Sequence, residues 1–300
     1  LAAHKGQWGP DATWIGYQLQ VSKEAIIASI KDSFISELRE SCKKISRNNF
    51  ITAKDLRRFT GQCNHVAGLL FGWRPFLECL WAALADHDRK YRNHKSKAPR
   101  QFIWRKQIQQ AVDWIGDFLH TRAGSLSRKW FFESYRLAEA DLIMALDASP
   151  FGIGGLLIKC GKIVAYFADA LTRDDEIILG QIIGYDRGQQ TWEALGVVVA
   201  LRVWSSEWMH RRIILHIQAD NIGALTLAAQ LKGKKGRGLL ARELALLYSE
   251  SCFEPRRLTR VPGVTNCSPD ALSRLTDPSG SYTLPPSVDA PTADYYPPTD

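Results

Sequence analysis

The sequence predicts an α/β fold, with a five-stranded mixed sheet and flanking helices in the second half of the chain, preceded by a mainly helical region. Two observations lead to this prediction. After residue 137, apolar runs and helical periods follow one another as three strands, a helix, a strand, two helices, a strand and a final helix, an order typical of a mixed sheet covered by helices. Before residue 130, apolar residues recur mostly at helical spacing.

Short strand-like segments account for the strands of the predicted sheet. They lie at 141–146, 152–160, 162–169, 212–218 and 256–261. Cys160-Gly161 separates the second segment from the third, and such a pair suits a tight hairpin turn. The helices that belong to this sheet are predicted at 189–208, which carries an amphipathic pattern, and at 221–231, 237–251 and 269–275.

The region before residue 130 is expected to consist mainly of helices. Apolar residues between Ala25 and Leu38 follow a helical period, which predicts a helix over 23–42. Thr52 followed by Asp55 resembles a capping box and marks the start of another helix. Further segments are predicted as helices at 63–70, 74–90 and 101–120 and as a short strand at 12–21.

Changes in composition divide the chain into regions. Gly and Ser residues interrupt the apolar pattern within 123–136, so residues 1–130 and 137–275 are predicted to be separate regions. Residues 276–300 hold six of the 13 prolines, four acids and no Lys or Arg. This composition predicts a Pro-rich, acidic, disordered tail.

The overall composition excludes several classes of protein. With 45% hydrophobic and 23% charged residues, the chain is globular and neither disordered nor fibrous. Its apolar runs fall short of the roughly 20 residues that cross a bilayer, so we expect no membrane association. The six cysteines form no C-x-x-C pair, which favours reduced thiols and an intracellular location, in the cytoplasm, the nucleus or both.

The chain is basic, with a formal net charge of +8. Because the tail contributes four acids and no bases, residues 1–275 carry +12. A charge of this sign favours a polyanionic partner, of which nucleic acid is the commonest. A soluble basic protein without such a partner has the same composition.

Acidic residues fall where predicted strands end and predicted helices begin. These residues are Asp147, Glu193, Asp220 and Asp270. If the strands before Asp147 and Asp220 are neighbours, all of these acids meet at one end of the sheet. Clustered carboxylates repel one another unless cations neutralise them. Oxygen ligands suit Mg²⁺ or Mn²⁺, and two such ions can clamp the attacking and leaving oxygens of a phosphodiester.

Each acid also has a purely structural interpretation. Asp147 before Ser-Pro suits a turn, and Asp220 before Asn suits a helix cap. Asp270 suits the first turn of a helix, where the helix dipole favours an acid, and an acid at the position of Glu193 is common for the same reason. Only the ordered set points to a metal site.

Short motifs surround these acids. They are Leu146-Asp147-Ala148-Ser149 with Gly152, Gly154 and Gly155, then Trp192-Glu193-Ala194-Leu195, then Ala219-Asp220-Asn221, and finally Val261-Pro262-Gly263 with Asn266 and Pro269-Asp270-Ala271-Leu272-Ser273-Arg274. Over residues 137–275 this order resembles the ribonuclease H domain of retrotransposon reverse transcriptases. The ending is the most specific part, because it follows the family pattern V-P-G-x-x-N-x-x-A-D-x-L-S-R with Pro269 in place of the usual Ala.

The resemblance implies a ribonuclease H-like fold and an endonuclease that hydrolyses the RNA strand of an RNA–DNA hybrid, leaving a 5′-phosphate and a 3′-hydroxyl. The acids implied as catalytic residues and as ligands of two Mg²⁺ or Mn²⁺ ions are Asp147, Glu193, Asp220 and Asp270, with Asp147 bridging both ions. The residues expected to contact nucleic acid are Ser149, Asn221, Asn266 and Arg274. Cellular members often carry a His before the last acid, and 261–270 contains none, which lowers the expected rate.

Upstream motifs are similar to other parts of such polyproteins. Lys5 to Gly9 with Thr13 to Tyr17 is similar to the end of the polymerase palm, where a strand pair grips the primer. The segment 56–77 resembles the thumb and connection of DIRS-like or gypsy-like elements. The remainder of a reverse transcriptase polyprotein is therefore an expected partner. The paired acids of the polymerase site belong upstream of this point, so no polymerase activity is expected from this chain.

A basic loop lies between two predicted helices. Lys234, Lys235 and Arg237 stand among glycines, and flexible point charges suit phosphate contacts that do not read sequence. A solvated loop is the alternative. For the tryptophans, among them Trp104 and Trp114 on one predicted helix, core packing is favoured over base stacking.

Two other functions are compatible with the sequence. A decayed element would keep the fold and bind nucleic acid without cleaving it. An integrase or transposase-like nuclease of the same fold class would carry a different last acid and no thumb ahead of it, so the segment 56–77 argues against this interpretation.

Overall fold

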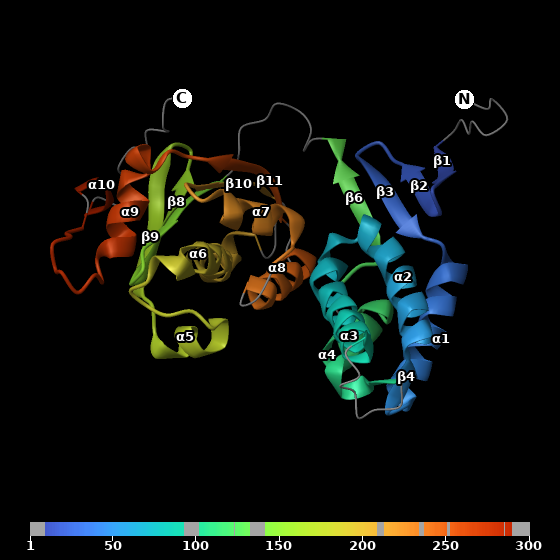
Figure 1. The fold of residues 1–300 in the computed structure, drawn as a ribbon. Coiled ribbons are helices and arrows are strands. Elements are labelled where there is room, and N and C mark those ends of the chain that lie inside the picture. Colours follow the sequence, from blue (N-terminus) through green and yellow to red (C-terminus); the bar gives the residue numbers. More distant parts are fainter. Residues whose placement is uncertain are drawn as a thin grey trace. The chain divides into compact units, whose positions relative to one another are not determined.

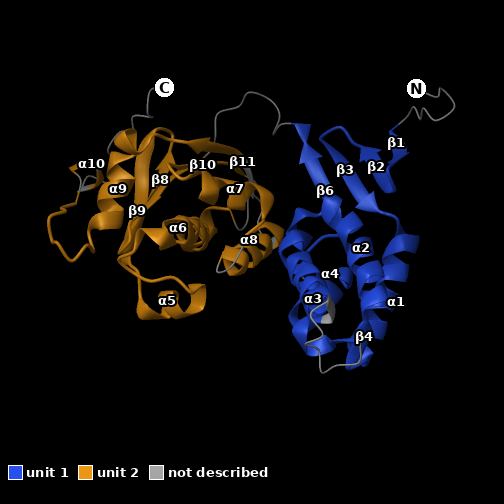
Figure 2. Cartoon of the chain, in the orientation of Figure 1, with its two compact units in different colours: residues 1–137 blue, residues 138–300 orange. Residues whose placement is uncertain are grey.

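A computed structural model of the chain describes residues 10–92, 102–122, 124–132, 142–208, 213–233, 237–250, 253–284 and 286–289. The chain divides into two units, residues 1–137 and 138–300, which Figures 1 and 2 show. The division comes directly after the interruption that the sequence shows at 123–136.

A five-stranded mixed sheet forms the centre of the second unit. Its strands are β7 (Leu142–Ala148), β8 (Gly152–Lys159), β9 (Lys162–Ala170), β10 (Ile213–Ala219) and β11 (Phe253–Arg260). They lie in the order β11-β10-β7-β8-β9. β10 is parallel to β7 and β11, whereas β8 is antiparallel to β7 and β9. The predicted five-stranded mixed sheet is therefore confirmed.

Helices cover both faces of this sheet. The helices of this unit are α5 (Arg173–Leu179), α6 (Gln189–Val203), α7 (Ile222–Gln230), α8 (Arg237–Glu250), α9 (Cys267–Arg274) and α10 (Pro286–Asp289). Figure 1 shows α6, α7 and α8 on one face and α9 on the other. The predicted helix at 189–208 is present as α6, but its buried residues cover more than the one apolar face of an amphipathic helix.

Glycine in β8 lets α9 lie directly on the sheet. A Cβ atom at Gly154 would lie 2.5 Å from the backbone nitrogen of Ser273 and 2.8 Å from the carbonyl oxygen of Pro269. Backbone atoms cannot move aside at low cost, so this close approach requires glycine. The buried side chains on this side of the sheet are Ala145, Leu156, Ile158, Ile163 and Leu272.

The structure differs from the predicted disordered tail at 276–300. Val288 of α10 is 3% exposed and packs in the same apolar cluster as Leu272, with Leu284 partly buried against it. Two apolar residues in a Pro-rich segment are enough to attach it, because the cluster offers an apolar surface that the sequence does not display. Residues 290–300 lie outside the described residues.

The first unit contains a sheet as well as the predicted helices. Its strands β1 (Asp11–Trp14), β2 (Tyr17–Val21), β3 (Ala25–Ile30) and β6 (Ser127–Phe131) form an antiparallel sheet in the order β1-β2-β3-β6. The helices are α1 (Asp32–Arg47), α2 (Ala53–Leu69), α3 (Arg74–Arg92) and α4 (Gln109–Leu119). The region is mainly helical as predicted, and where the sequence predicts one short strand at 12–21 the structure has the hairpin β1–β2 of a four-stranded sheet.

Two local predictions in this unit have opposite outcomes. The helix predicted over 23–42 is wrong at its start, because β3 occupies Ala25–Ile30 and α1 begins only at Asp32. The β-branched isoleucines of this segment favour an extended chain, and pairing with β2 and β6 supplies the hydrogen bonds. The helix start at Thr52 is confirmed, since Thr52 Oγ1 accepts a hydrogen bond from the Asp55 backbone at 3.0 Å.

A two-stranded antiparallel ribbon lies at the end of the helices that is remote from this sheet. It consists of β4 (Phe50–Thr52) and β5 (Phe102–Trp104), and Figure 1 labels β4 beside the ends of α1 and α2. β5 falls within the segment 101–120 that the sequence predicts as one helix. Three residues of alternating burial form a strand there, and the helix α4 begins at Gln109.

Candidate metal centre

Parallel pairing brings Asp147 and Asp220 together. Leu146 of β7 lies opposite Ala219 of β10, so the residues that follow them lie side by side at the carboxyl edge of the sheet. Asp147 is 5% exposed, and Asp220 is half-buried. The strands before Asp147 and Asp220 are therefore neighbours, which is the condition under which the sequence predicts that these two acids meet.

Glu193 reaches the same edge from α6. Its side chain is 3% exposed. Gln189, one turn earlier, donates a hydrogen bond to Glu193 Oε1 at 3.1 Å and another to the carbonyl of Ala148. Carboxylate oxygens of Asp147, Glu193 and Asp220 all lie within 4.8 Å of one another. At this spacing the trio could hold a divalent metal ion.

Burial and mutual repulsion raise the pKa values of the trio. Burial raises the pKa of Asp147 to about 7, and the charges of Asp220 and Asp270 act in the same direction. Burial, reinforced by the charges of Asp147 and Asp220, holds the pKa of Glu193 well above its usual value. Burial and the charge of Asp270 also raise the pKa of Asp220. Because these acids resist ionising together, a divalent cation would stabilise the site.

We expect the Asp147 carboxyl to make the metal-free protein less stable as the pH rises from about 4 to about 7. Its pKa is about 7 in the folded state and near 4 in an unfolded chain. The folded state therefore retains the proton across this interval, and the stabilisation is lost as the pH passes the folded-state pKa. A bound cation replaces the proton and should restore stability.

Thermal unfolding near pH 5 and near pH 8, with EDTA or with Mn²⁺, measures this effect. Comparison with Asp147→Asn isolates the carboxyl, because the amide does not titrate. An equal pH dependence in the wild type and the variant would contradict the raised pKa of Asp147.

Asp270 lies near the trio and is held by an ion pair. Arg274 donates from Nε to Asp270 Oδ1 at 2.7 Å, one helical turn along α9. The guanidinium of Arg274 also lies over the ring of Tyr282, with 5.5 Å from Cζ to the ring centroid. The structure places the fourth predicted acid beside Asp147 and Asp220, where its charge raises their pKa values, and outside the three-carboxylate group.

Ser149 and Asn266, both predicted to contact nucleic acid, have structural partners instead. Ser149 is 1% exposed, accepts a hydrogen bond from the Gly152 backbone and donates one to the carbonyl of Ser273 at 2.7 Å. Asn266 is 4% exposed and donates from Nδ2 to the carbonyl of Leu146 at 3.0 Å. These side chains hold the turn after β7 and the loop before α9 in place, and burial keeps them from a ligand.

Asn221 and Arg237 are the remaining predicted contacts that the structure describes. Asn221 caps α7, and its Oδ1 accepts from the Gly223 backbone at 2.7 Å. Arg237, the first residue of α8, donates from Nη1 to Gln190 Oε1 at 2.9 Å. Gln190 lies in the first turn of α6, three residues before Glu193. Lys234 and Lys235 lie outside the described residues.

Two supporting residues are absent from the predicted site. Ser273 donates from Oγ to Asp147 Oδ2 at 2.9 Å across 126 residues of chain, a contact that only the fold creates. Gln189 stands four residues before Glu193, a spacing that places both side chains on one helix face. The four-residue spacing could therefore have identified Gln189 from the sequence as a hydrogen-bond partner of Glu193.

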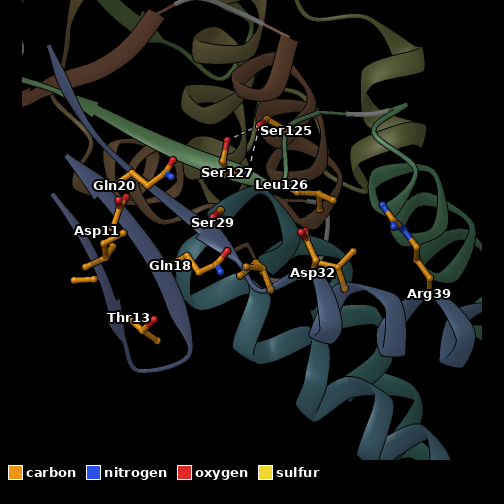
Figure 3. Close-up of a pocket in the computed structure, with 14 residues that line it drawn as sticks. Asp11, Thr13, Gln18, Gln20, Ser29, Asp32, Arg39, Ser125, Leu126 and Ser127 are labelled. Carbon is orange, nitrogen blue, oxygen red and sulfur yellow. Dashed lines mark hydrogen bonds between the residues drawn. The ribbon is translucent and has the colours of Figure 1, made fainter. Parts of the chain in front are cut away.

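A hollow in the first unit has a different chemistry. Its volume is about 860 Å³, and Figure 3 shows it beside β1, β2 and β3, the start of α1 and the segment before β6. Hydroxyl and amide side chains line it, together with Asp11, Asp32 and Arg39. Arg39 donates two hydrogen bonds to the carbonyl of Leu119. Within the described part of the chain, the lining acids form no group with metal-ligand spacing.

Across the described residues, none of the helices is both long enough and apolar enough to span a bilayer.

No protein-family model and no curated protein matches this chain. Solved structures of the foamy viral protease-reverse transcriptase are similar to 84% of it. The complex with an RNA/DNA hybrid is 14% identical with a TM-score of 0.30. The dRH form with double-stranded DNA is 16% identical with a TM-score of 0.31, and another complex with double-stranded DNA is 15% identical with a TM-score of 0.28. This chain spans 29%, 37% and 44% of those chains, respectively.

Proposed function

We propose that the second unit is a metal-dependent endonuclease that hydrolyses the RNA strand of RNA–DNA hybrids. The observation that carries this proposal is the trio Asp147, Glu193 and Asp220, whose carboxylate oxygens lie within 4.8 Å of one another. The order of motifs that resembles ribonuclease H supports the hybrid as the substrate. The net charge of +8 supports a polyanionic ligand.

The acidic residues of the site would bind two metal ions. The trio would hold one Mg²⁺ or Mn²⁺ ion, and Asp270 together with Asp147 would hold a second. Such ions, when bound, activate a water molecule and stabilise the phosphodiester oxygens during hydrolysis. Arg274 donates a hydrogen bond to Asp270 Oδ1, so Oδ2 of Asp270 would be the atom that binds the ion.

Hydrogen bonds from neighbouring side chains orient two of the carboxylates that would bind the metal. Ser273 donates to Asp147 Oδ2, and Gln189 donates to Glu193 Oε1. Each bond restricts a carboxylate that would otherwise rotate, and such outer partners commonly contribute a factor of about 10 to 100 in metal affinity or activity.

The proposed nucleic-acid contacts surround the same edge of the sheet. Asn221 keeps its amide nitrogen for a sugar hydroxyl while its oxygen caps α7. Arg274 supplies charge beside Asp270, and Arg237, Lys234 and Lys235 would add charge for contacts with the phosphate backbone. The partner of this unit would be the remainder of a reverse transcriptase polyprotein. The free thiols of the described cysteines support an intracellular location, in the cytoplasm or the nucleus.

Cleavage of a strand-labelled hybrid tests the proposal. The full chain is incubated with an RNA–DNA duplex labelled on one strand at a time, with Mg²⁺, Mn²⁺ or EDTA. We expect shorter RNA products with either metal, an intact DNA strand, and no products in EDTA, because both the ions and the 2′-hydroxyl pattern of RNA are required.

Each other outcome identifies a competing function. Cutting of both strands would favour an integrase or transposase-like nuclease. Binding of the hybrid without cutting in either metal would favour a decayed module. Cutting that persists in EDTA would rule out metal-dependent hydrolysis by the trio.

A further inference from the structure

Alternation along the β4–β5 ribbon sorts its side chains onto two faces. Phe50 pairs with Trp104, Ile51 with Ile103, and Thr52 with Phe102. Ile51 and Ile103 are 6% and 2% exposed, so they face the helices. Phe50, Phe102 and Trp104 are 40%, 37% and 51% exposed. The outer face of the ribbon is therefore aromatic.

The outward aromatic side chains form one cluster, which we call the ribbon cluster. The ring centroids of Phe50 and Trp104 are 4.3 Å apart, and those of Phe50 and Phe102 are 6.4 Å apart. The core packing predicted for the tryptophans holds for Trp114, which stacks on Phe76 at 3.6 Å, and is wrong for Trp104. Three adjoining aromatic rings left in solvent are a typical mark of a binding surface.

The surroundings of the ribbon cluster are basic. A groove of about 690 Å³ adjoins it, lined by Phe50, Phe102 and residues of α1 and α2. Lys43, Lys44 and Arg47 line the groove. Lys54, Arg105 and Lys106 follow the two strands of the ribbon within two residues along the chain. Among the described ion pairs, none engages these side chains. They are therefore available to a polyanion.

Two of the three acids that line the groove already accept hydrogen bonds from other side chains of the protein. Glu37 Oε1 accepts hydrogen bonds from Arg58 and Gln62, both at 3.1 Å. Asp55 Oδ2 accepts from Thr52 Oγ1 at 2.7 Å. Glu40 is the other acid of the lining. The segments 43–54 and 102–107 contain no acid at all, so basic side chains outnumber acidic ones around the cluster.

We propose that the ribbon cluster is a binding site for single-stranded nucleic acid, separate from the metal centre. Exposed rings offer stacking surfaces for unpaired bases, and the surrounding cations attract the phosphates. A duplex would hide the faces of its bases, and an acidic protein partner would not require a row of rings. This site goes beyond the proposed nuclease function and does not depend on it.

Anisotropy of a labelled oligothymidylate of about 12 nucleotides measures binding at a site of this kind. The full chain is titrated in EDTA, so that no metal ion bridges the strand to the carboxylates. We expect Trp104→Ala to weaken binding by at least about fivefold, as the loss of one stacked base implies. Trp104→Phe should retain most of the affinity, because Phe keeps a stacking face.

Trp81→Ala is the matched control. Trp81 lies on α3 of the same unit and is 46% exposed, and it is not a member of the ribbon cluster or of the groove lining, so its truncation removes a comparable side chain from outside the proposed site. Arg105→Ala with Lys106→Ala should lower the slope of log affinity against log salt by about 1.4, at roughly 0.7 for each contact with a single strand.

Other outcomes overturn the proposal. Absence of binding by the wild type, or equal weakening by Trp104→Ala and Trp81→Ala, excludes a stacking site at the ribbon. Concentration-dependent self-association that Trp104→Ala abolishes, together with no binding of the oligonucleotide, would make the cluster a protein interface.

Discussion

Asp147→Asn is expected to abolish cleavage of the RNA strand while the protein remains folded. The substitution removes one negative charge from the centre of the trio and keeps the size of the side chain. The amide oxygen can still accept the hydrogen bond from Ser273 that Asp147 Oδ2 accepts. Loss of a ligand that supports several kcal/mol of metal-ion stabilisation corresponds to a rate at least about 10³-fold lower.

Stability separates this loss from simple unfolding. Burial raises the pKa of Asp147 to about 7. At neutral pH and without metal, the negative charge of Asp147 therefore destabilises the folded state. Asp147→Asn should therefore raise the melting temperature in EDTA while it removes activity. Mn²⁺ should stabilise the wild type more than the variant.

Asp174→Asn is the control for this experiment. Asp174 is an exposed acid in the first turn of α5, in the same unit, and its neutralisation should leave cleavage unchanged. Full activity in Asp147→Asn would show that the trio is not the catalytic site.

Gly154→Ala is expected to destabilise the second unit by about 3 kcal/mol, at the upper end of the usual effect of overpacking. The new Cβ would meet the Ser273 nitrogen at 2.5 Å and the Pro269 carbonyl oxygen at 2.8 Å. Relief requires α9 to move away from β8. Because α9 carries Asp270 and Ser273, cleavage should fall together with stability.

Gly196→Ala provides the matched control. The nearest atom to a Cβ there is the carbonyl oxygen of Asp147 at 3.9 Å, an ordinary contact. Inside α6 the added methyl should stabilise the helix by up to about 1 kcal/mol. Urea unfolding of both variants measures the contrast, and a Gly154→Ala protein as stable as the wild type would contradict the close packing of α9 on β8.

The strands β7, β8 and β10 of the second unit could be predicted from sequence because each is a largely apolar run. The Cys160-Gly161 pair also marks its turn directly, since both residues have positive φ angles of 51° and 72°. In the first unit the same reasoning failed at β3. Its isoleucines fit a helical period and a strand equally well, and only pairing with β2 and β6 decides between them.

The tail and the ribbon show a second limit of sequence reasoning. Val288 stands in a Pro-rich segment with little apolar pattern, and its burial depends on a cluster built from β7, β8, β9 and α9. Trp104 precedes the helix α4 by five residues in the sequence, and its exposure depends on the register of β5 against β4. Both outcomes require knowledge of which distant segments meet.

The sequence by itself determined which acids could form the centre, because strand ends and helix starts are local features of the chain. Tertiary structure decided how those residues are used. The parallel register of β7 and β10 places Asp147 beside Asp220, and α9 brings Ser273 to Asp147 while Arg274 holds Asp270. It also buries Ser149 and Asn266, which the motifs alone presented as contacts. The physical reason is that burial and charge interaction depend on distances in space, which residues far apart in the sequence acquire only when the chain folds.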